Sequence, residues 1–198
     1  MNNYKKIQLY EEAAKFELLE DYREAFNLYL ASAKQGYAKS QLAVAKYYLG
    51  SGDYKGIIKY DRKKAVEFLN LAEAGGNAEA KYLLAKIILE QKYSGDIKRA
   101  VELLQDASDR KYTPASYELA KCYYYGVGCG QDYNKALTLL GRIMYAYVEP
   151  TQREHYNGMK KILTEIKALV SEHKEAVCLS EDDRCLFNDL CNDLDVED

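Results

Sequence analysis

The sequence has no tryptophan, only two prolines and no long apolar run, and each shortage excludes a class of protein. Two prolines in 198 residues do not make a loop-rich or polyproline protein. A membrane-spanning helix needs about 18 or more consecutive apolar residues, and none are present. The first ten residues lack the apolar stretch and cleavage site of a secretory signal. We therefore expect a cytoplasmic protein that does not bind membranes.

The chain also has no excess of basic residues. The chain has 28 Lys and Arg against 31 Asp and Glu, a net charge of −3, which does not favour a nucleic-acid partner. The charge is uneven, because residues 177–198 carry eight acids and one arginine, a net −7, and residues 1–176 therefore sum to +4. The apolar fraction of 48% predicts a packed core. With 20 tyrosines and 4 phenylalanines, most aromatic side chains are amphipathic.

Motifs for catalysis and for bound cofactors are also missing. The glycine pairs Gly50-Ser51-Gly52 and Gly126-Val127-Gly128 follow predicted helices rather than strands, so neither is a phosphate-binding loop. The sequence contains no GxSxG and no HExxH motif. We expect no enzymatic activity and no cofactor.

What the sequence does contain is a fourfold repeat of two short motifs in the same order. Asp-x-x-x-Ala recurs with spacings of 40, 35 and 36 residues, starting at Asp21, Asp61, Asp96 and Asp132. An Ala-Lys pair precedes each copy: Ala14-Lys15, Ala45-Lys46, Ala85-Lys86 and Ala120-Lys121. Asp in the first turn of a helix caps free backbone N–H groups, and glycines such as Gly36 and Gly75-Gly76 end helices. Each repeat is therefore predicted to be two antiparallel helices, with the motif alanines Ala25, Ala65, Ala100 and Ala136 buried between them.

The fourth copy carries the fullest pattern. Leu119-Ala120-x-x-Tyr123 is followed by Gly126-x-Gly128 and then by Asp132-x-x-x-Ala136. This order resembles the Sel1-like repeat, a relative of the tetratricopeptide repeat. The resemblance implies an all-α, right-handed superhelical solenoid of antiparallel helix pairs that acts as a non-enzymatic scaffold or adaptor. The expected divisions are four repeats at 1–36, 37–75, 76–110 and 111–148, a capping helix at 149–176, and an acidic tail with a short helix and several cysteines at 177–198.

The same resemblance places a concave binding groove along the first helix of each repeat. Lysines flanked by Tyr and Leu would suit an acidic peptide or a partner protein with a free carboxylate. The alternative is a solvated lysine face that duplication has copied. Tyr48, Tyr123 and Phe68 are expected in the core, and the run Tyr123-Tyr124-Tyr125 is expected to give one core residue and two groove or rim residues. The groove residues are expected to be Lys15, Leu42, Lys46, Leu49, Tyr82, Lys86, Leu89, Tyr117, Lys121 and Tyr124.

Two other functions fit parts of the sequence. One is a specific inhibitor or immunity-type protein that blocks one partner with its convex surface or with loop 50–60. The extra residues 53–60 either project from the fold or pack down through Ile57 and Ile58. The other is a metal- or redox-responsive protein that uses the tail residues His173, Cys178, Cys185 and Cys191.

The spacing of these tail residues matches no zinc knuckle, so we expect no metal site. Cys122 and Cys129 resemble the paired cysteines that bridge two helices in secreted members of the family. They form either that disulfide or two reduced thiols, and we expect reduced thiols.

Overall fold

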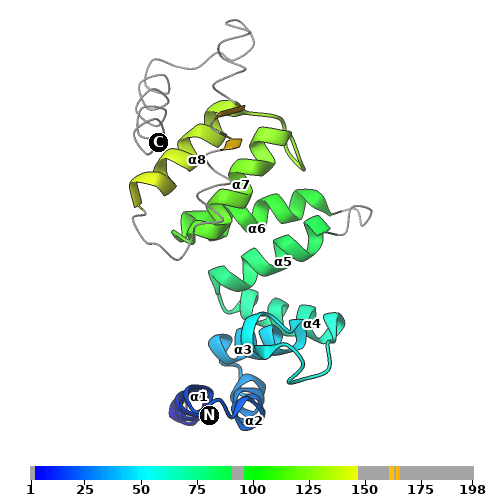
Figure 1. Ribbon diagram of the computed structural model, residues 1–198, viewed down its shortest axis with the longest axis vertical. Helices are drawn as coiled ribbons and strands as arrows, with labels where there is room; N and C mark the ends of the chain where they lie inside the picture. The colour runs from blue at the N-terminus through cyan, green and yellow to red at the C-terminus, as the bar shows by residue number, and fades with distance from the viewer. Residues whose placement is uncertain (1–2, 91–95, 147–160, 163, 166–198) are drawn as a thin grey trace, which may run out of the picture. The chain divides into compact units, whose positions relative to one another are not determined.

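The computed structural model describes residues 3–90, 96–146, 161, 162, 164 and 165. This part of the chain contains eight α-helices, one 3₁₀ helix and no strand, so the predicted all-α class is confirmed. Figure 1 shows the helices in chain order. They are α1 (Asn3–Leu18), α2 (Tyr22–Lys34), α3 (Ala38–Leu49), η1 (Gly52–Tyr54), α4 (Arg62–Ala74), α5 (Ala78–Glu90), α6 (Ile97–Asp109), α7 (Thr113–Tyr125) and α8 (Tyr133–Ala146).

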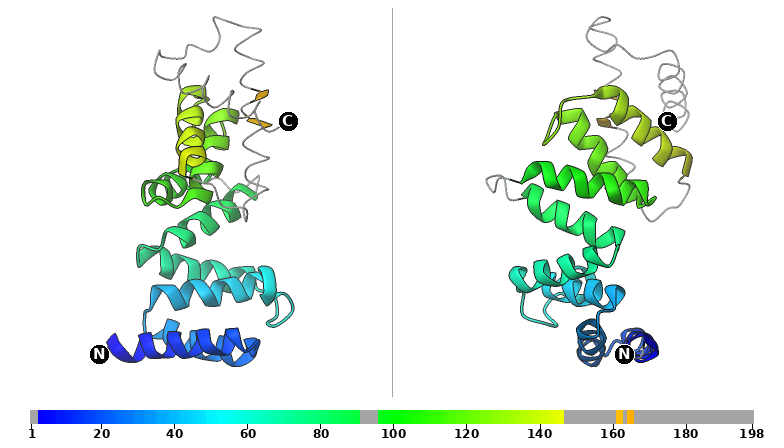
Figure 2. Two further views of the ribbon diagram at one scale, coloured as in Figure 1. Left: turned by 60° about the vertical axis from the view of Figure 1, so that its left-hand side comes forward. Right: turned by 180° about the vertical axis from the view of Figure 1, so that it is seen from behind.

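Contacts divide the chain into two units, residues 1–87 and residues 88–198. In the N-terminal unit α1 packs on α2, α2 on α3 and α3 on α4, as the views of Figure 2 show. In the C-terminal unit α6 packs on α7 and α7 on α8. Each of these helices therefore packs on its neighbour in the sequence, which is the arrangement of a helical-repeat protein.

Aspartates mark the start of the second helix in each repeat. The carboxylates of Asp21, Asp61 and Asp132 each accept the backbone N–H three residues ahead, at 3.0 to 3.2 Å. Four residues after each repeat aspartate stands one of the motif alanines, and all four are 0% exposed: Ala25, Ala65, Ala100 and Ala136. Their predicted burial is confirmed, and a larger side chain there would push the two helices of a repeat apart.

In each of the first three repeats, the residue two positions after the second helix has a left-handed backbone conformation. Gly36 and Gly76 have φ of 79° and 80°, and Lys111 takes their place in the third repeat with φ of 63°. Gly75 is needed for a different reason. A Cβ atom on it would lie 2.7 Å from the Cβ of Ala38, so the start of α3 approaches α4 too closely for any side chain.

The core of the N-terminal unit is largely aromatic. Tyr47 is 0% exposed, and its ring centroid lies 5.3 Å from that of Phe26. Tyr48 and Phe68, which were predicted in the core, are half-buried and pack against this cluster, and Tyr123 is half-buried too. The tyrosines that are buried are their neighbours Tyr47 and Tyr124, at 0% and 7% exposure, since a step of one residue along a helix turns the side chain by more than a quarter of a circle.

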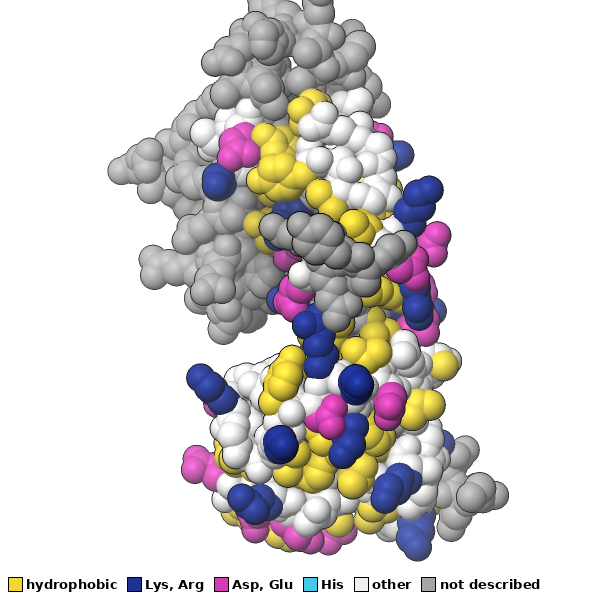
Figure 3. All heavy atoms as spheres, turned by 90° about the vertical axis from the view of Figure 1, so that its right-hand side faces the viewer, with side chains coloured by type: hydrophobic (Ala, Val, Ile, Leu, Met, Phe, Trp, Pro, Cys, Tyr) yellow, Lys and Arg dark blue, Asp and Glu magenta, His cyan; other side chains and the backbone are white. Residues whose placement is uncertain are grey.

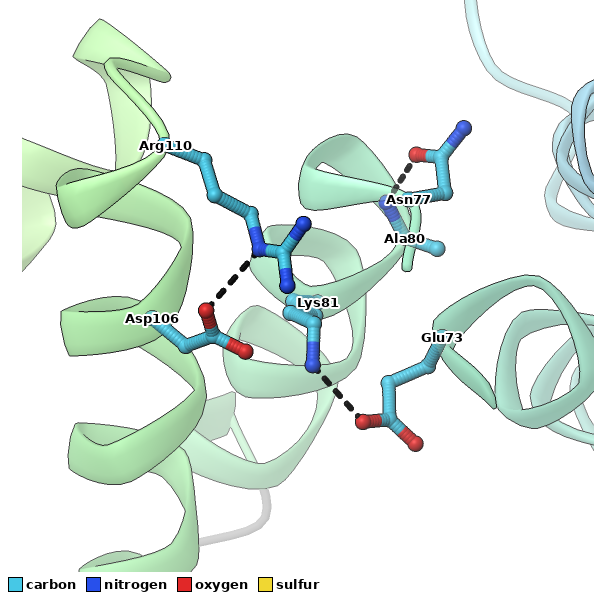
Figure 4. A network of polar contacts seen from close by, with 6 residues as sticks. All are labelled: Glu73, Asn77, Ala80, Lys81, Asp106 and Arg110. Carbon is cyan, nitrogen blue, oxygen red and sulfur yellow. Dashed lines mark hydrogen bonds and ion pairs between the residues drawn. The ribbon is translucent and has the colours of Figure 1, made fainter. Parts of the chain in front are cut away.

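One lysine of the N-terminal unit is buried together with its counter-ion. Lys81 on α5 is 7% exposed, and its Nζ lies 2.8 Å from the carboxylate of Glu73 on α4. Figure 4 shows this pair beside the cap of α5, where the Asn77 side chain accepts the N–H of Ala80 at 3.0 Å. The pair joins α4 to α5, and removing Glu73 would take an opposite charge away from a buried ammonium.

The inserted segment between α3 and α4 packs against the core. Tyr54 stacks on Tyr47 with 4.2 Å between ring centroids, and Ile57 and Ile58 are half-buried against the same cluster. Of the two alternatives for this segment, the structure therefore supports packing. Tyr60 at its end is the exception, with 60% of its surface exposed.

The predicted capping helix and acidic tail lie outside the described residues, apart from the four between 161 and 165. The same holds for His173, Cys178, Cys185 and Cys191. In the part of the chain that the structure describes, no helix has the length and apolar character needed to cross a membrane. No three His, Cys, Asp or Glu side chains gather there into a metal site.

Candidate functional site

A repeated backbone hydrogen bond fixes the alignment of the first helices. The N–H of the capping aspartate donates to the carbonyl of an aromatic residue near the end of the first helix, Phe16, Tyr48 or Tyr123, at 2.9 to 3.0 Å. Three residues before each acceptor stands an alanine with 0% exposure: Ala13, Ala45 and Ala120. The first repeat therefore aligns on Ala13 and not on Ala14.

This alignment corrects one of the predicted groove residues. The residue that matches Lys46, Lys86 and Lys121 is Ala14, and Lys15 stands one position further along α1, exposed to solvent. The predicted row of four equivalent lysines is thus a row of three. The run Ala13-Ala14-Lys15 allows two alignments, and the sequence pattern favoured the wrong one.

The three equivalent lysines each have a close partner. Lys46 forms an ion pair with Glu79 of the next repeat. The Nζ of Lys86 lies 5.6 Å from the ring centroid of Tyr82, and that of Lys121 lies 5.4 Å from the ring centroid of Tyr117. Both pairs are four residues apart on one helix, so each tyrosine and lysine share a face and make a cation–π contact.

The other predicted groove residues differ in how much surface they offer. Leu49, Leu89 and Tyr117 are half-buried. Leu42, Tyr82 and Tyr124 are only 8%, 9% and 7% exposed, so they support the surface more than they present one. The lysines and the half-buried residues therefore carry most of the accessible area.

A cavity of about 540 Å³ lies in the C-terminal unit, beside one of the three lysines. Its size is within the usual range for sites that hold a small ligand or an anchoring side chain. Among the lining residues that the structure describes, Leu89 and Lys121 were predicted as groove residues and Tyr125 as a groove or rim residue, and the other four were not predicted. The described lining residues are Leu89, Ile97, Glu118, Lys121, Cys122, Tyr125 and Val127.

The cavity combines apolar walls with one ion pair. The Nζ of Lys121 donates to the carboxylate of Glu118 at 2.9 Å. Burial lowers the pKa of Lys121, but the hydrogen bond and charge of Glu118 outweigh it, so the pKa stands above its ordinary value and the ammonium stays charged. On the apolar side Tyr125 is 54% and Val127 39% exposed, which is unusual for large apolar side chains in one small area.

A glycine shapes one wall of this cavity. Gly128 follows α7 with φ of 74°, and a Cβ atom on it would lie 2.7 Å from a methyl carbon of Ile97. Glycine thus lets the loop after α7 lie directly against the start of α6, and this contact sets the position of Val127.

The cysteine in the cavity is a free thiol. Cys122 and Cys129 are both free cysteines, and the structure places no disulfide between them. Burial raises the pKa of Cys122 to about 12 and raises that of Cys129 as well. Both thiols are therefore protonated at neutral pH and are poor nucleophiles, and the cavity is better suited to binding than to covalent chemistry.

Known proteins share both the repeat and the fold. The Sel1 repeat family model matches residues 9–37, 38–77, 78–112 and 113–142. Chitin synthase regulatory factor 1 of Schizosaccharomyces pombe is 29% identical over 137 residues, which are 67% of this chain and 28% of that protein.

Solved structures agree at the level of the fold. A Sel1 repeat protein from Oxalobacter formigenes has a TM-score of 0.63 and 19% identity, over 79% of this chain and 44% of that one. The protein c5321, a protective antigen present in uropathogenic Escherichia coli strains, has a TM-score of 0.62 and 18% identity, over 92% of this chain and 44% of that one. The chain thus spans less than half the length of these relatives, and the predicted repeat-solenoid fold is confirmed.

Proposed function

Because the chain belongs to the Sel1 repeat family, whose members generally mediate protein–protein interaction, we propose that it is a non-enzymatic scaffold or adaptor that binds a segment of a partner protein along the first helices of its repeats. The observation that carries the proposal is the cavity beside Lys121 in the C-terminal unit. It offers an apolar side chain of the partner a preformed place to bury. The free thiols Cys122 and Cys129 fit a reducing compartment, so the cytoplasm is part of the proposal.

Apolar anchoring supplies most of the affinity in this proposal. Leu89, Ile97 and Val127 form walls that a Leu or Phe side chain would fill. Burying such a side chain is worth about 1.5–3 kcal/mol. Tyr125, with 54% of its surface exposed, adds rigid aromatic contact area at the rim.

The lysines have a second role, which is to orient the partner. Lys46 and Lys121 already face Glu79 and Glu118, so an acidic group of the partner must compete with a carboxylate of this chain. A partly screened ion pair of this kind contributes about 1 kcal/mol or less. The charge therefore favours acidic segments over basic ones without fixing a single sequence.

Peptide display against the full chain, followed by calorimetric titration of a selected peptide, tests the proposal. Replacing Val127 by Asp or Tyr125 by Ala should weaken binding about tenfold, because an apolar contact of about 1.4 kcal/mol is lost. The matched control is Leu71→Ala, since Leu71 is 52% exposed on α4 in the other unit.

Lys121→Gln should weaken binding about threefold or less, while Lys98→Gln, an exposed lysine on α6, should have no effect. Circular dichroism confirms that each variant is folded. Selected peptides whose affinity is the same for the Val127, Tyr125 and Leu71 variants would show that the cavity is not the binding site.

A further inference from the structure

The segment that joins the inserted loop to α4 is strongly basic. Residues 55–64 contain five basic side chains and one acid, in a chain whose net charge is −3. Four of its lysines are exposed, and the 60% exposed ring of Tyr60 stands among them in the sequence. We call these residues the basic insert surface: Lys55, Lys59, Tyr60, Lys63 and Lys64. The loop lies on the side of the N-terminal unit that Figure 3 presents, where Lys and Arg side chains gather among hydrophobic ones.

The acid and the arginine within the segment are already engaged. The Asp61 carboxylate caps α4 by accepting the Lys64 N–H at 3.1 Å, and it lies 3.8 Å from the ammonium of Lys64. Arg62 donates from Nη2 to the carbonyl of Ile87 at 2.9 Å. Asp61 therefore offsets part of the charge of Lys64, and Arg62 serves the link between α4 and α5. The exposed acids Asp53 and Glu67 flank the surface in the sequence and limit its positive charge to this short stretch.

The surface rests on a well-packed base. Tyr54, just before it, stacks on the fully buried Tyr47, and Ile57 and Ile58 pack against the aromatic core. Lys64 lies 5.3 Å from the ring centroid of Tyr48, and the Asp61 N–H donates to the Tyr48 carbonyl at 3.0 Å. The backbone that carries the lysines is therefore held in place before a partner arrives, which lowers the entropy cost of binding.

We propose that the basic insert surface is a second protein-interaction site, which binds an acidic segment of a partner protein with Tyr60 as its aromatic contact. It is separate from the proposed cavity site in the C-terminal unit and does not depend on it. The length of the surface favours an acidic polypeptide over a nucleic acid. Asp53 and Glu67 stand at its two ends, so the row of cations is too short to follow a long phosphate backbone.

The test uses the full-length chain and a labelled acidic peptide. The probe has the sequence of residues 177–198, net charge −7, with its cysteines changed to serine, and binding is followed by fluorescence anisotropy. The surface variant changes Lys55, Lys59, Lys63 and Lys64 to Gln. The control variant makes the same charge change at four other exposed lysines: Lys5, Lys34, Lys39 and Lys98.

We expect the surface variant to bind about tenfold more weakly than the wild type and the control variant to stay within about twofold. Tyr60→Ala should weaken binding about threefold, and raising the salt from about 50 to 200 mM should weaken the wild type several-fold. Equal losses in the surface and control variants would overturn the proposal, because net charge alone would then explain binding. Absence of binding by the wild type would overturn it as well.

A labelled single-stranded oligonucleotide provides the remaining comparison. If it binds more tightly than the peptide and its binding depends on the same four lysines, the surface is a nucleic-acid site and the proposal is wrong. Because the altered side chains are exposed, the melting temperature should fall by no more than a few degrees in any variant, and the surface variant loses the contacts of Lys64 with Asp61 and Tyr48. The variants of this surface and the variants of the cavity change residues in different units, so either proposal can be refuted without refuting the other.

Discussion

Glu17 is a shared hydrogen-bond acceptor for two tyrosines of the N-terminal unit. The Tyr29 hydroxyl donates to one of its carboxylate oxygens at 2.8 Å, and the Tyr47 hydroxyl to the other at 3.4 Å. Glu17 also contributes, after burial, to the raised pKa of Tyr54. One carboxylate on α1 therefore joins the first helix pair to α3.

Changing Glu17 to Ala should destabilise the N-terminal unit strongly. Tyr29 and Tyr47 are 2% and 0% exposed, so their hydroxyls would lose the carboxylate with little access to water. A buried donor left unsatisfied costs about 1–3 kcal/mol, and two of them together give an expected loss of about 3–4 kcal/mol in the free energy of unfolding. Glu17→Gln keeps one acceptor oxygen and should cost about half as much.

The same cluster predicts a loss of stability at high pH. Burial first, and then the nearby Glu17 carboxylate, raises the pKa of Tyr29, Tyr47 and Tyr54 above the ordinary value of 10. Below pH 10 these phenols are protonated in the folded and the unfolded chain, so their contribution is fully present. Above pH 10 the unfolded chain releases its protons first, and the free energy of unfolding falls as the pH rises.

Urea denaturation followed by circular dichroism measures both effects, at pH 7 and again above pH 10. The control is Glu11→Ala, because Glu11 is an exposed glutamate on the same helix and should change stability by less than about 0.5 kcal/mol. In Glu17→Ala the decline above pH 10 should remain but become smaller, since burial, the largest cause of the raised pKa values, is still present. If Glu17→Ala costs no more than Glu11→Ala, the carboxylate does not hold the cluster together.

Two further substitutions test the repeat itself by thermal unfolding. Ala65→Leu should cost about 1–3 kcal/mol by overpacking the contact between α3 and α4, whereas Asn70→Leu at an exposed site on α4 should be nearly neutral; equal effects would contradict the repeat alignment. Lys111→Gly should stabilise the chain by about 0.5–1 kcal/mol because it removes the strain of φ 63° at a place where two other repeats have glycine, and a loss of stability would show that the Lys111 side chain matters more than its backbone.

The repeat and its caps were predictable because they depend on local chemistry. An aspartate caps a helix through atoms three residues away, and a buried alanine is required wherever two helices approach closely. Both are short-range features within one repeat. The fourfold recurrence of Asp-x-x-x-Ala correctly predicted the burial of Ala25, Ala65, Ala100 and Ala136. The resemblance to the Sel1-like repeat rested on the same residues and was confirmed with them.

The candidate site was less predictable because it depends on contacts between elements distant in the sequence. The cavity brings Leu89 on α5 and Ile97 at the start of α6 to the α7 residues around Lys121. Glu118 gave no signal of its own, and Cys122 was considered only as one of a possible pair with Cys129, although both stand within three residues of the predicted Lys121. The run Tyr123-Tyr124-Tyr125 was expected to give one core residue and two groove or rim residues, and the structure buries Tyr124 and leaves Tyr125 54% exposed.

The third repeat differs from other repeats in three local features, which are an aromatic residue of its first helix, the aspartate cap of its second helix and the glycine after that helix. Ile88 stands where the second and fourth repeats have Tyr48 and Tyr123, the two rings that lie under the ammonium groups of Lys64 and Lys135. Within the described residues Asp96 makes no side-chain cap bond, unlike the other three aspartates.

A lysine, Lys111, also replaces the helix-ending glycine of the third repeat. Each of these three features contributes about 0.5–2 kcal/mol to the stability of a repeat. Because the third repeat lacks all three, its local interactions make it the least stable repeat. The boundary between the two contact units falls in its first helix, between Ile87 and Ile88. Because a helical-repeat chain depends on each repeat and its neighbours, we expect cooperativity to be lost first in this third repeat.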